Sequence, residues 1–197
     1  MSKINKYNKI LVFQYGKVGS TTIMKNYYGK NYETIQDDYK EYLIHTHSHK
    51  IAIDILKKYK NILIINIVRL PINRNLSAFY QNINQYTPNY KKLSFDELSE
   101  LFNQNFSVSL LDNWMIGFFE IFKLNIDDFK FNFSEKYNFF NKKGNDIIIF
   151  KFEDLNYIIS EILPKFNIFI NNSYNLSSDK NYYQIYQKHK KIYNVSN

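Results

Sequence analysis

The sequence contains no cysteine, which excludes disulfide bonds and zinc sites built from thiolates. Proline and glycine are scarce, with three and five residues among 197. Arginine is rarer still, because Arg69 and Arg74 are the only two in a chain with 26 basic residues. No apolar run approaches the ~20 residues that span a bilayer, so we expect no membrane span. The scarce residue types gather in two short segments, which makes those segments the first candidates for a functional site.

The overall composition is that of a folded protein. A hydrophobic content of 45% with 22% charged residues predicts a globular chain, and 197 residues suit a single domain over 1–197. The first residues, Met1–Lys6, are polar and carry no secretory signal, so we expect a cytoplasmic protein. The net charge of +8 has two interpretations, a solvated lysine-rich surface or attraction to an anionic partner such as a nucleotide or a charged glycan.

Apolar runs and helical periodicity alternate along the first half of the chain. We expect strands over 9–14, 42–46, 62–68 and 146–152. We expect helices over 20–28, 72–83, 96–102, 110–122, 155–163 and 180–193, and a further helix that follows Ser48 as its cap. Residues 129–143 suggest a hairpin or lid, and 171–179 a loop. This order predicts an α/β fold with a central parallel sheet flanked by helices and with ligands at the carboxyl ends of the strands.

The segment Tyr15–Thr22 follows the first predicted strand and opens a helix. Its two glycines let the backbone approach an anion, and the helix amino terminus directs unpaired amides and a positive dipole at it. Lys17 adds a positive charge. The alternative to an anion-binding loop is an ordinary strand-to-helix turn. The loop lacks the GxxxxGK[ST] spacing of nucleoside triphosphatases. The candidate anion-binding residues are Gly16, Lys17, Val18, Gly19, Ser20, Thr21 and Thr22.

The segment Val68–Phe79 holds both arginines and follows the third predicted strand. Arg69 stands where that strand ends, and Ser77 lies eight positions later on the next helix. A guanidinium fork and a hydroxyl could converge there on one phosphate, whereas the alternative is an arginine paired with a surface carboxylate. Because arginine rather than aspartate follows the strand, a metal-free anion site is favoured over an ATPase site.

Together the two segments resemble the PAPS-dependent sulfotransferases, where PAPS is 3′-phosphoadenosine 5′-phosphosulfate. In that superfamily a strand–loop–helix with lysine and hydroxyl residues binds the 5′-phosphosulfate. An Arg-x-Pro segment with a serine eight residues after the arginine binds the 3′-phosphate. The resemblance implies a P-loop-like sulfotransferase fold, with Lys17 stabilising the leaving phosphate and with Arg69 and Ser77 holding the 3′-phosphate.

Two later segments are similar to one branch, the capsular-polysaccharide-synthesis proteins related to glycan sulfotransferases. An apolar strand ends in Glu153-Asp154-Leu155, and a tail of the form Asn…Lys-x-Tyr…Tyr covers 175–186. The resemblance spans roughly residues 8 to 190. It implies a carbohydrate acceptor, and it implies that the tail, about 175–197, folds over the nucleotide so that Lys180 reaches it.

The histidines at 45, 47 and 49 stand at alternate positions after the second predicted strand, and would share one face if the strand continued. From the residues alone, these histidines could be zinc ligands, structural residues or the source of a catalytic base. The resemblance to the His-x-His of glycan 2-O-sulfotransferases implies that His47 is the base and that His45 supports it. Glu120 and Glu153 are fallback bases, although Glu153 could instead cap the helix at Leu155. Trp114 and the phenylalanines at 118, 119 and 122 suggest core.

These observations favour an enzyme that moves a sulfuryl group from PAPS to an acceptor hydroxyl and leaves adenosine 3′,5′-bisphosphate. We expect no metal requirement, no nucleic-acid partner and polysaccharide sulfation as the setting. Two alternatives stay open: a small P-loop kinase, and a polyanion-binding module without catalysis.

Overall fold

The computed structural model describes residues 6–28, 41–106, 109–125, 130–169 and 180–193. The chain divides into two compact units, unit 1 within residues 1–69 and 114–174 and unit 2 within 70–113 and 175–197. The strands are β1 (Lys9–Phe13), β2 (Leu43–Thr46), β3 (Ile62–Val68), β4 (Tyr137–Lys142) and β5 (Asn145–Lys151). The helices are α1 (Ser20–Tyr28), α2 (His49–Lys58), α3 (Pro71–Gln81), α4 (Ile83–Tyr86), α5 (Phe95–Asn105), α6 (Ser109–Phe122), α7 (Leu155–Tyr157) and α8 (Tyr183–Tyr193). Shorter turns are η2 (Tyr90–Lys92), η3 (Phe152–Asp154), η4 (Ile158–Ile162) and η5 (Leu163–Phe166).

Unit 1 is built on a five-stranded sheet in the order β2-β1-β3-β5-β4. The first four strands are parallel and β4 pairs antiparallel with β5. The strands β3 and β5 are buried over six of their seven residues, as expected of parallel strands covered on both faces. Because β2 and β3 lie on opposite sides of β1, the strand order reverses between β1 and β3. Open α/β sheets bind ligands at the carboxyl ends of the strands flanking such a reversal.

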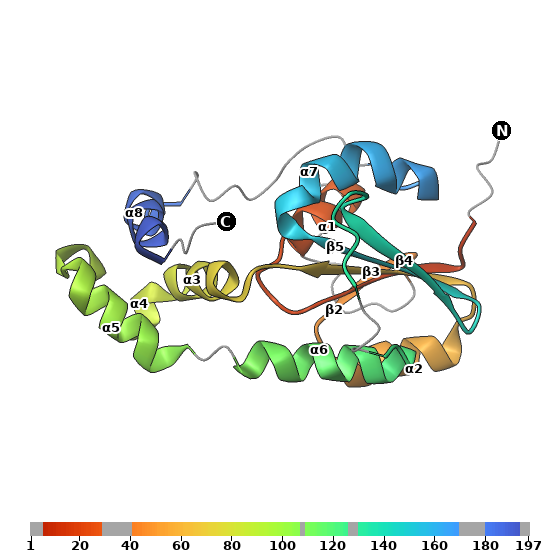
Figure 1. The fold of residues 1–197 in the computed structure, drawn as a ribbon, viewed down its shortest axis with the longest axis horizontal. Coiled ribbons are helices and arrows are strands. Elements are labelled where there is room, and N and C mark those ends of the chain that lie inside the picture. The colour runs from red at the N-terminus through yellow and green to blue at the C-terminus, as the bar shows by residue number, and fades with distance from the viewer. Residues whose placement is uncertain (1–5, 29–40, 107–108, 126–129, 170–179, 194–197) are drawn as a thin grey trace. The chain divides into compact units, whose positions relative to one another are not determined.

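Helices cover both faces of this sheet, as Figure 1 shows for α1 and α7 on one side and for α2 and α6 on the other. Side-chain alternation along β1 explains the arrangement, since Ile10 and Val12 pack with α1 and η4 residues while Leu11 and Phe13 pack with α2 and α6 residues. The prediction of an α/β fold with a mostly parallel central sheet is confirmed. The core assignment of the α6 aromatic residues is also confirmed for Trp114, Phe118, Phe119 and Phe122.

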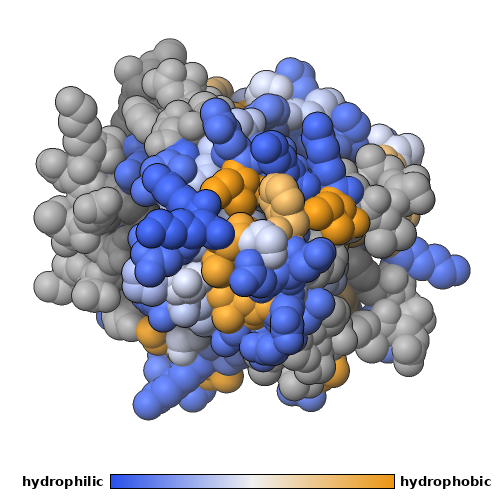
Figure 2. Space-filling view, turned by 90° about the vertical axis from the view of Figure 1, so that its left-hand side faces the viewer, coloured by the Kyte–Doolittle hydropathy of each residue, from blue (hydrophilic) through white to orange (hydrophobic). Residues whose placement is uncertain are grey.

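Unit 2 is helical and packs around aromatic side chains of α3, α5 and α8. The helix α5 begins with a capping box between Ser94 and Glu97. At the centre, His189 of α8 is fully buried, with Nδ1 2.8 Å from the Tyr80 hydroxyl and Nε2 2.9 Å from the Ser99 hydroxyl. Figure 2 shows a small group of hydrophobic residues among mainly hydrophilic ones on the face that it views.

Two predicted helices are divided differently in the structure. The helix predicted over 72–83 divides at Asn82 into α3 and α4. The helix predicted over 155–163 is a short α-helical turn, a π-helix and a 3₁₀ turn that contains Pro164, because proline is tolerated in a first turn but not in a helix interior. The expected hairpin forms between β4 and β5. Residues 171–179, expected as a loop, lie outside the described residues.

Each unit has its own core, and that the whole chain forms one cooperative domain stays a prediction. The tail is helical from Tyr183 as expected, and its helix packs with α3 residues inside unit 2. Among the described helices, none combines the length and the apolar character needed to cross a bilayer.

Candidate functional site

The loop between β1 and α1 bends sharply through two left-handed residues. Lys17 has φ of 69° and Gly19 has φ of 91°. A residue other than glycine in this region costs roughly 1–2 kcal/mol, so the rest of the loop must hold Lys17 in place. The helix then starts at Ser20, and the Thr22 amide donates to the Gly19 carbonyl at 3.1 Å. The loop thus has the tight strand-to-helix geometry that the glycine spacing predicted.

Gly19 lets this loop pack closely against the segment that follows β5. A Cβ atom at position 19 would lie 2.7 Å from Cε2 of Phe152 and 3.3 Å from Cδ2 of Leu155. Carbon atoms in contact normally stay about 3.5–4.0 Å apart. Glycine is therefore required at this position for two reasons, the left-handed backbone and the contact with the Phe152 ring.

Arg69 leaves the end of β3 and contacts both of these segments. Its guanidinium carbon lies 4.5 Å from the centre of the Phe152 ring, and its Nη1 donates to the Lys17 carbonyl oxygen at 3.1 Å. An arginine over an aromatic face within about 6 Å is attracted by the ring quadrupole. The exits of β1, β3 and β5 are thereby joined through Lys17, Arg69 and Phe152.

The loop side chains differ in exposure. Gly16, Lys17 and Thr21 are partly exposed, and the hydroxyl-bearing residues Ser20 and Thr22 are buried. Val18 is also buried and belongs to the core cluster with α1. The accessible part of the loop is therefore its backbone, Lys17 and Thr21.

His47 follows β2 and is held by a backbone group of the neighbouring strand. Its Nδ1 lies 2.7 Å from the carbonyl oxygen of Gln14, and because a carbonyl only accepts, Nδ1 carries the hydrogen. In the neutral ring Nε2 then has the lone pair, and the side chain is exposed. This is the geometry of a general base whose tautomer is set by a second hydrogen bond.

His45 lies two residues before His47, with its ring edge-on to that of His47 at 4.5 Å between centroids. Burial, and secondarily the charge on His47, lower the pKa of His45 to about 4, so the ring is neutral near pH 7. His49 does not continue the row because α2 begins there, and its Nε2 donates instead to the Trp114 carbonyl at 3.1 Å. Within the described part of the chain no three metal-ligating side chains gather.

Polar atoms without hydrogen-bond partners collect at the same edge of the sheet. Both amide atoms of the fully buried Gln14, Nε2 of His45 and Oδ1 of Asn66 have none among the described residues. These residues stand at or near the carboxyl ends of β1, β2 and β3. Each such group costs about 1–3 kcal/mol, and buried polar atoms of this kind are normally satisfied by water or by a ligand. The edge therefore fits a polar ligand, although the sequence analysis had not singled out Gln14 or Asn66.

Two predicted nucleotide-binding residues belong to unit 2. Ser77 is half-buried in α3, and Lys180 is exposed ahead of α8. The expectation that Ser77 and Arg69 converge on one phosphate stays a prediction, as does the reach of Lys180 towards the nucleotide.

The two fallback carboxylates are both exposed, Glu120 on α6 and Glu153 in η3. The idea that Glu153 caps the helix at Leu155 is wrong, because the residue at that position is Asp154 and it makes no side-chain cap.

The contact between Gly19 and Phe152 predicts the effect of adding one methyl group. Gly19→Ala should lower the free energy of unfolding by about 1–3 kcal/mol more than Gly144→Ala, because an overpacked contact adds to the left-handed strain. Gly144 is the matched control, since its φ is 73° and nothing lies within 4 Å of its Cβ position. Urea unfolding of the two variants measures the difference, and equal losses would contradict the close packing.

The lowered pKa of His45 predicts an acid-sensitive stability. The unfolded chain, with the usual histidine pKa of 6.5, takes up a proton first as the pH falls. The free energy of unfolding should therefore decrease between pH 6.5 and about 4, and His45→Gln should remove that part of the decrease. His189→Gln should remove a separate part of the decrease, because burial also lowers the pKa of His189, which lies in unit 2. An unchanged pH profile in His45→Gln, measured by urea unfolding, would refute this assignment.

Comparison with protein-family models, with curated proteins and with solved structures finds no match to this chain. The loop after β1, the Arg69 contacts and the histidine pair are therefore the observations from which a function can be inferred.

Proposed function

We propose that the protein is a sulfotransferase that uses PAPS to sulfate a hydroxyl group of a carbohydrate. The observation that carries the proposal is the bond from Arg69 Nη1 to the Lys17 carbonyl oxygen at 3.1 Å. It brings the single arginine of unit 1 against the glycine loop, at the reversal of strand order where α/β sheets bind ligands. A phosphorylated nucleotide needs cationic and amide donors at two anionic groups, and these two segments supply them.

In this proposal the residues of the loop have distinct tasks. The backbone of Gly16–Gly19 and the amino terminus of α1 hold the 5′-phosphosulfate, since amides and the helix dipole favour negative charge. Lys17 stabilises charge on the leaving phosphate oxygen, and removal of one such donor typically lowers a rate by ~10²–10³. Arg69 holds the 3′-phosphate through its guanidinium. Bound PAPS supplies an activated sulfuryl group, whose bond to the phosphate oxygen breaks as a bond to the acceptor oxygen forms.

His47 takes the proton of the acceptor hydroxyl in this scheme. Its Nδ1 hydrogen is held by the Gln14 carbonyl, which leaves Nε2 as the accepting atom on an exposed ring. His45 supports the base by packing against it as a neutral ring, and a neutral neighbour does not repel the positive charge that His47 acquires. A base of this kind contributes ~10²–10⁴ to a rate.

Nucleotide preference tests the assignment directly. Adenosine 3′,5′-bisphosphate without metal should raise the thermal stability, by ~2.7 kcal/mol at 100 times its dissociation constant, and AMP and ATP should do so less. Arg69→Ala should abolish the preference for the 3′-phosphate. Arg74→Ala is the control, because Arg74 bonds to Asn75 within α3. Stabilisation by ATP that requires magnesium would favour a kinase instead. Binding that ignores the 3′-phosphate and falls steeply with salt would favour a polyanion-binding module.

The role of His47 is tested separately from nucleotide binding. His47→Ala should leave the affinity for adenosine 3′,5′-bisphosphate unchanged and slow sulfation by ~10²–10⁴ in single turnover with radiolabelled sulfuryl donor. His49→Ala is the matched control, because that ring bonds to the Trp114 carbonyl rather than facing His47. Normal turnover in His47→Ala would move the base to Glu120 or Glu153.

A further inference from the structure

Two phenylalanines and a lysine form a cluster beside the end of β5, which we name the aromatic platform: Phe131 and Lys151, which are half-buried, and Phe133, which is exposed. Phe133 is 72% exposed, more than any other large hydrophobic side chain among the described residues. The two rings lie 5.2 Å apart, and Lys151 Nζ lies 4.6 Å from the Phe133 ring centre and 5.3 Å from that of Phe131. An exposed ring beside a second ring and a cation offers both stacking and charge to a ligand.

The turn that carries the platform is held by side-chain hydrogen bonds. Asn132 Oδ1 accepts from the Glu135 amide at 3.1 Å and from the Ser134 hydroxyl at 2.8 Å. Asn138 of β4 accepts from the Asn132 amide at 2.9 Å and donates to the Lys130 carbonyl at 2.8 Å. A turn fixed in this way presents the rings without further ordering, which reduces the entropy lost when a ligand binds.

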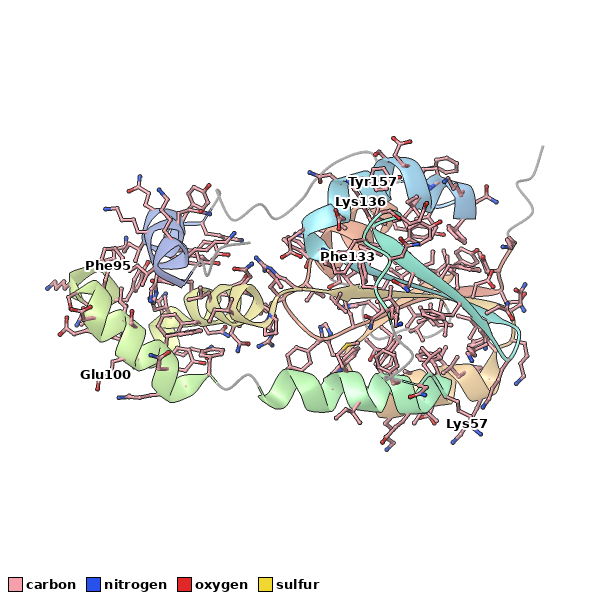
Figure 3. All side chains as sticks on the ribbon, in the orientation of Figure 1. Lys57, Phe95, Glu100, Phe133, Lys136 and Tyr157 are labelled. Atoms are coloured by element: carbon pink, nitrogen blue, oxygen red, sulfur yellow. The ribbon has the colours of Figure 1, made fainter. Side chains whose placement is uncertain are left out.

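Lys151 differs from the neighbouring lysine in its partners. Lys136 is engaged, since its Nζ lies 3.9 Å from Asp154 Oδ1 and 4.5 Å from the centre of the Tyr157 ring. Figure 3 shows Phe133, Lys136 and Tyr157 close to β4 and α7. Lys151, by contrast, has no carboxylate oxygen within 4 Å in the described part of the chain, and its Nζ lies over the two phenylalanine rings instead.

The platform lies at the same edge of the sheet as the candidate site. Lys151 is the last residue of β5 and pairs with Val68, the residue before Arg69. Phe152 follows Lys151, and the Arg69 guanidinium lies over its ring. The strand bearing His47 is three strands away, and neighbouring strands are about 4.8 Å apart, so the two exits are separated by roughly 14 Å. One sugar ring is too short to occupy both places, whereas an oligosaccharide can.

We propose that the aromatic platform is a subsite for a carboxylated polysaccharide, with a sugar ring stacked on Phe133 and its carboxylate bound by Lys151. The inference deepens the proposed function, because a chain anchored at the platform would extend along the carboxyl ends of the strands towards His47. The aromatic rings select a sugar face, and the lysine selects an acidic sugar over a neutral one.

Binding of a galacturonic acid hexamer, measured by calorimetry without nucleotide, tests the subsite. Phe133→Leu should weaken binding roughly tenfold, because the flat ring is lost while apolar size is kept, and Phe133→Trp should retain it. Lys151→Ala should weaken it up to about fivefold at low salt and less at high salt. Phe139→Ala and Lys142→Ala are the controls and should not alter hexamer binding. Both residues are exposed on β4, outside the turn that Asn132 holds.

The outcomes separate this inference from the proposed function. Hexamer binding that Phe133→Leu leaves unchanged, or equal binding of a neutral galactose hexamer, would overturn the carboxylated-sugar subsite. Binding of phosphatidylserine-containing vesicles through Phe133, without binding of the hexamer, would also overturn the carboxylated-sugar subsite. If the subsite fails while adenosine 3′,5′-bisphosphate still binds with its 3′-phosphate preference, the sulfotransferase proposal stands. If the hexamer binds but the nucleotide does not, the subsite stands and the sulfotransferase proposal fails.

Discussion

The guanidinium of Arg69 depends on two neighbours, the Phe152 ring beneath it and the Lys17 carbonyl that accepts its hydrogen bond. These contacts connect three strand exits that are far apart in the sequence. The same ring also fills the space that a side chain at Gly19 would need. The shape of the loop and the position of the arginine are therefore not independent. A change at either residue alters the packing of Phe152 and, through it, the other.

Much of this arrangement could be predicted from the sequence because the responsible signals are local. Apolar runs bounded by turns predicted the parallel strands, and the glycine spacing predicted the loop that opens α1. The position of Arg69 at the end of β3 followed from the same pattern. By contrast, Phe152 is 83 residues away from Arg69, and no local rule links an aromatic residue to a cation at that separation.

Other features depended on details that a periodic pattern does not contain. His49 would share a face with the other two histidines if the strand continued, but the strand ends at Thr46 and the helix start places His49 against Trp114. Asn66 interrupts an apolar strand and could have been noticed as a polar residue in a buried position. Its contact, a bond from Nδ2 to the Phe13 carbonyl at 2.8 Å, still required the neighbouring strand to be known. The turn with Phe133 was expected only as part of a hairpin or lid over 129–143, since the hydrogen bonds of Asn132 and Asn138 that hold it span several residues.

The left-handed backbone of Lys17 has a consequence for how the loop meets a ligand. Its unfavourable conformation is already present in the folded chain, so that energy is spent in folding and not at the moment of encounter. A ligand that entered the loop would meet a backbone that is already bent, and little free energy would be lost in rearranging it. An anion whose geometry matched the bent loop would bind without the loop opening, and an anion of another shape would be disfavoured.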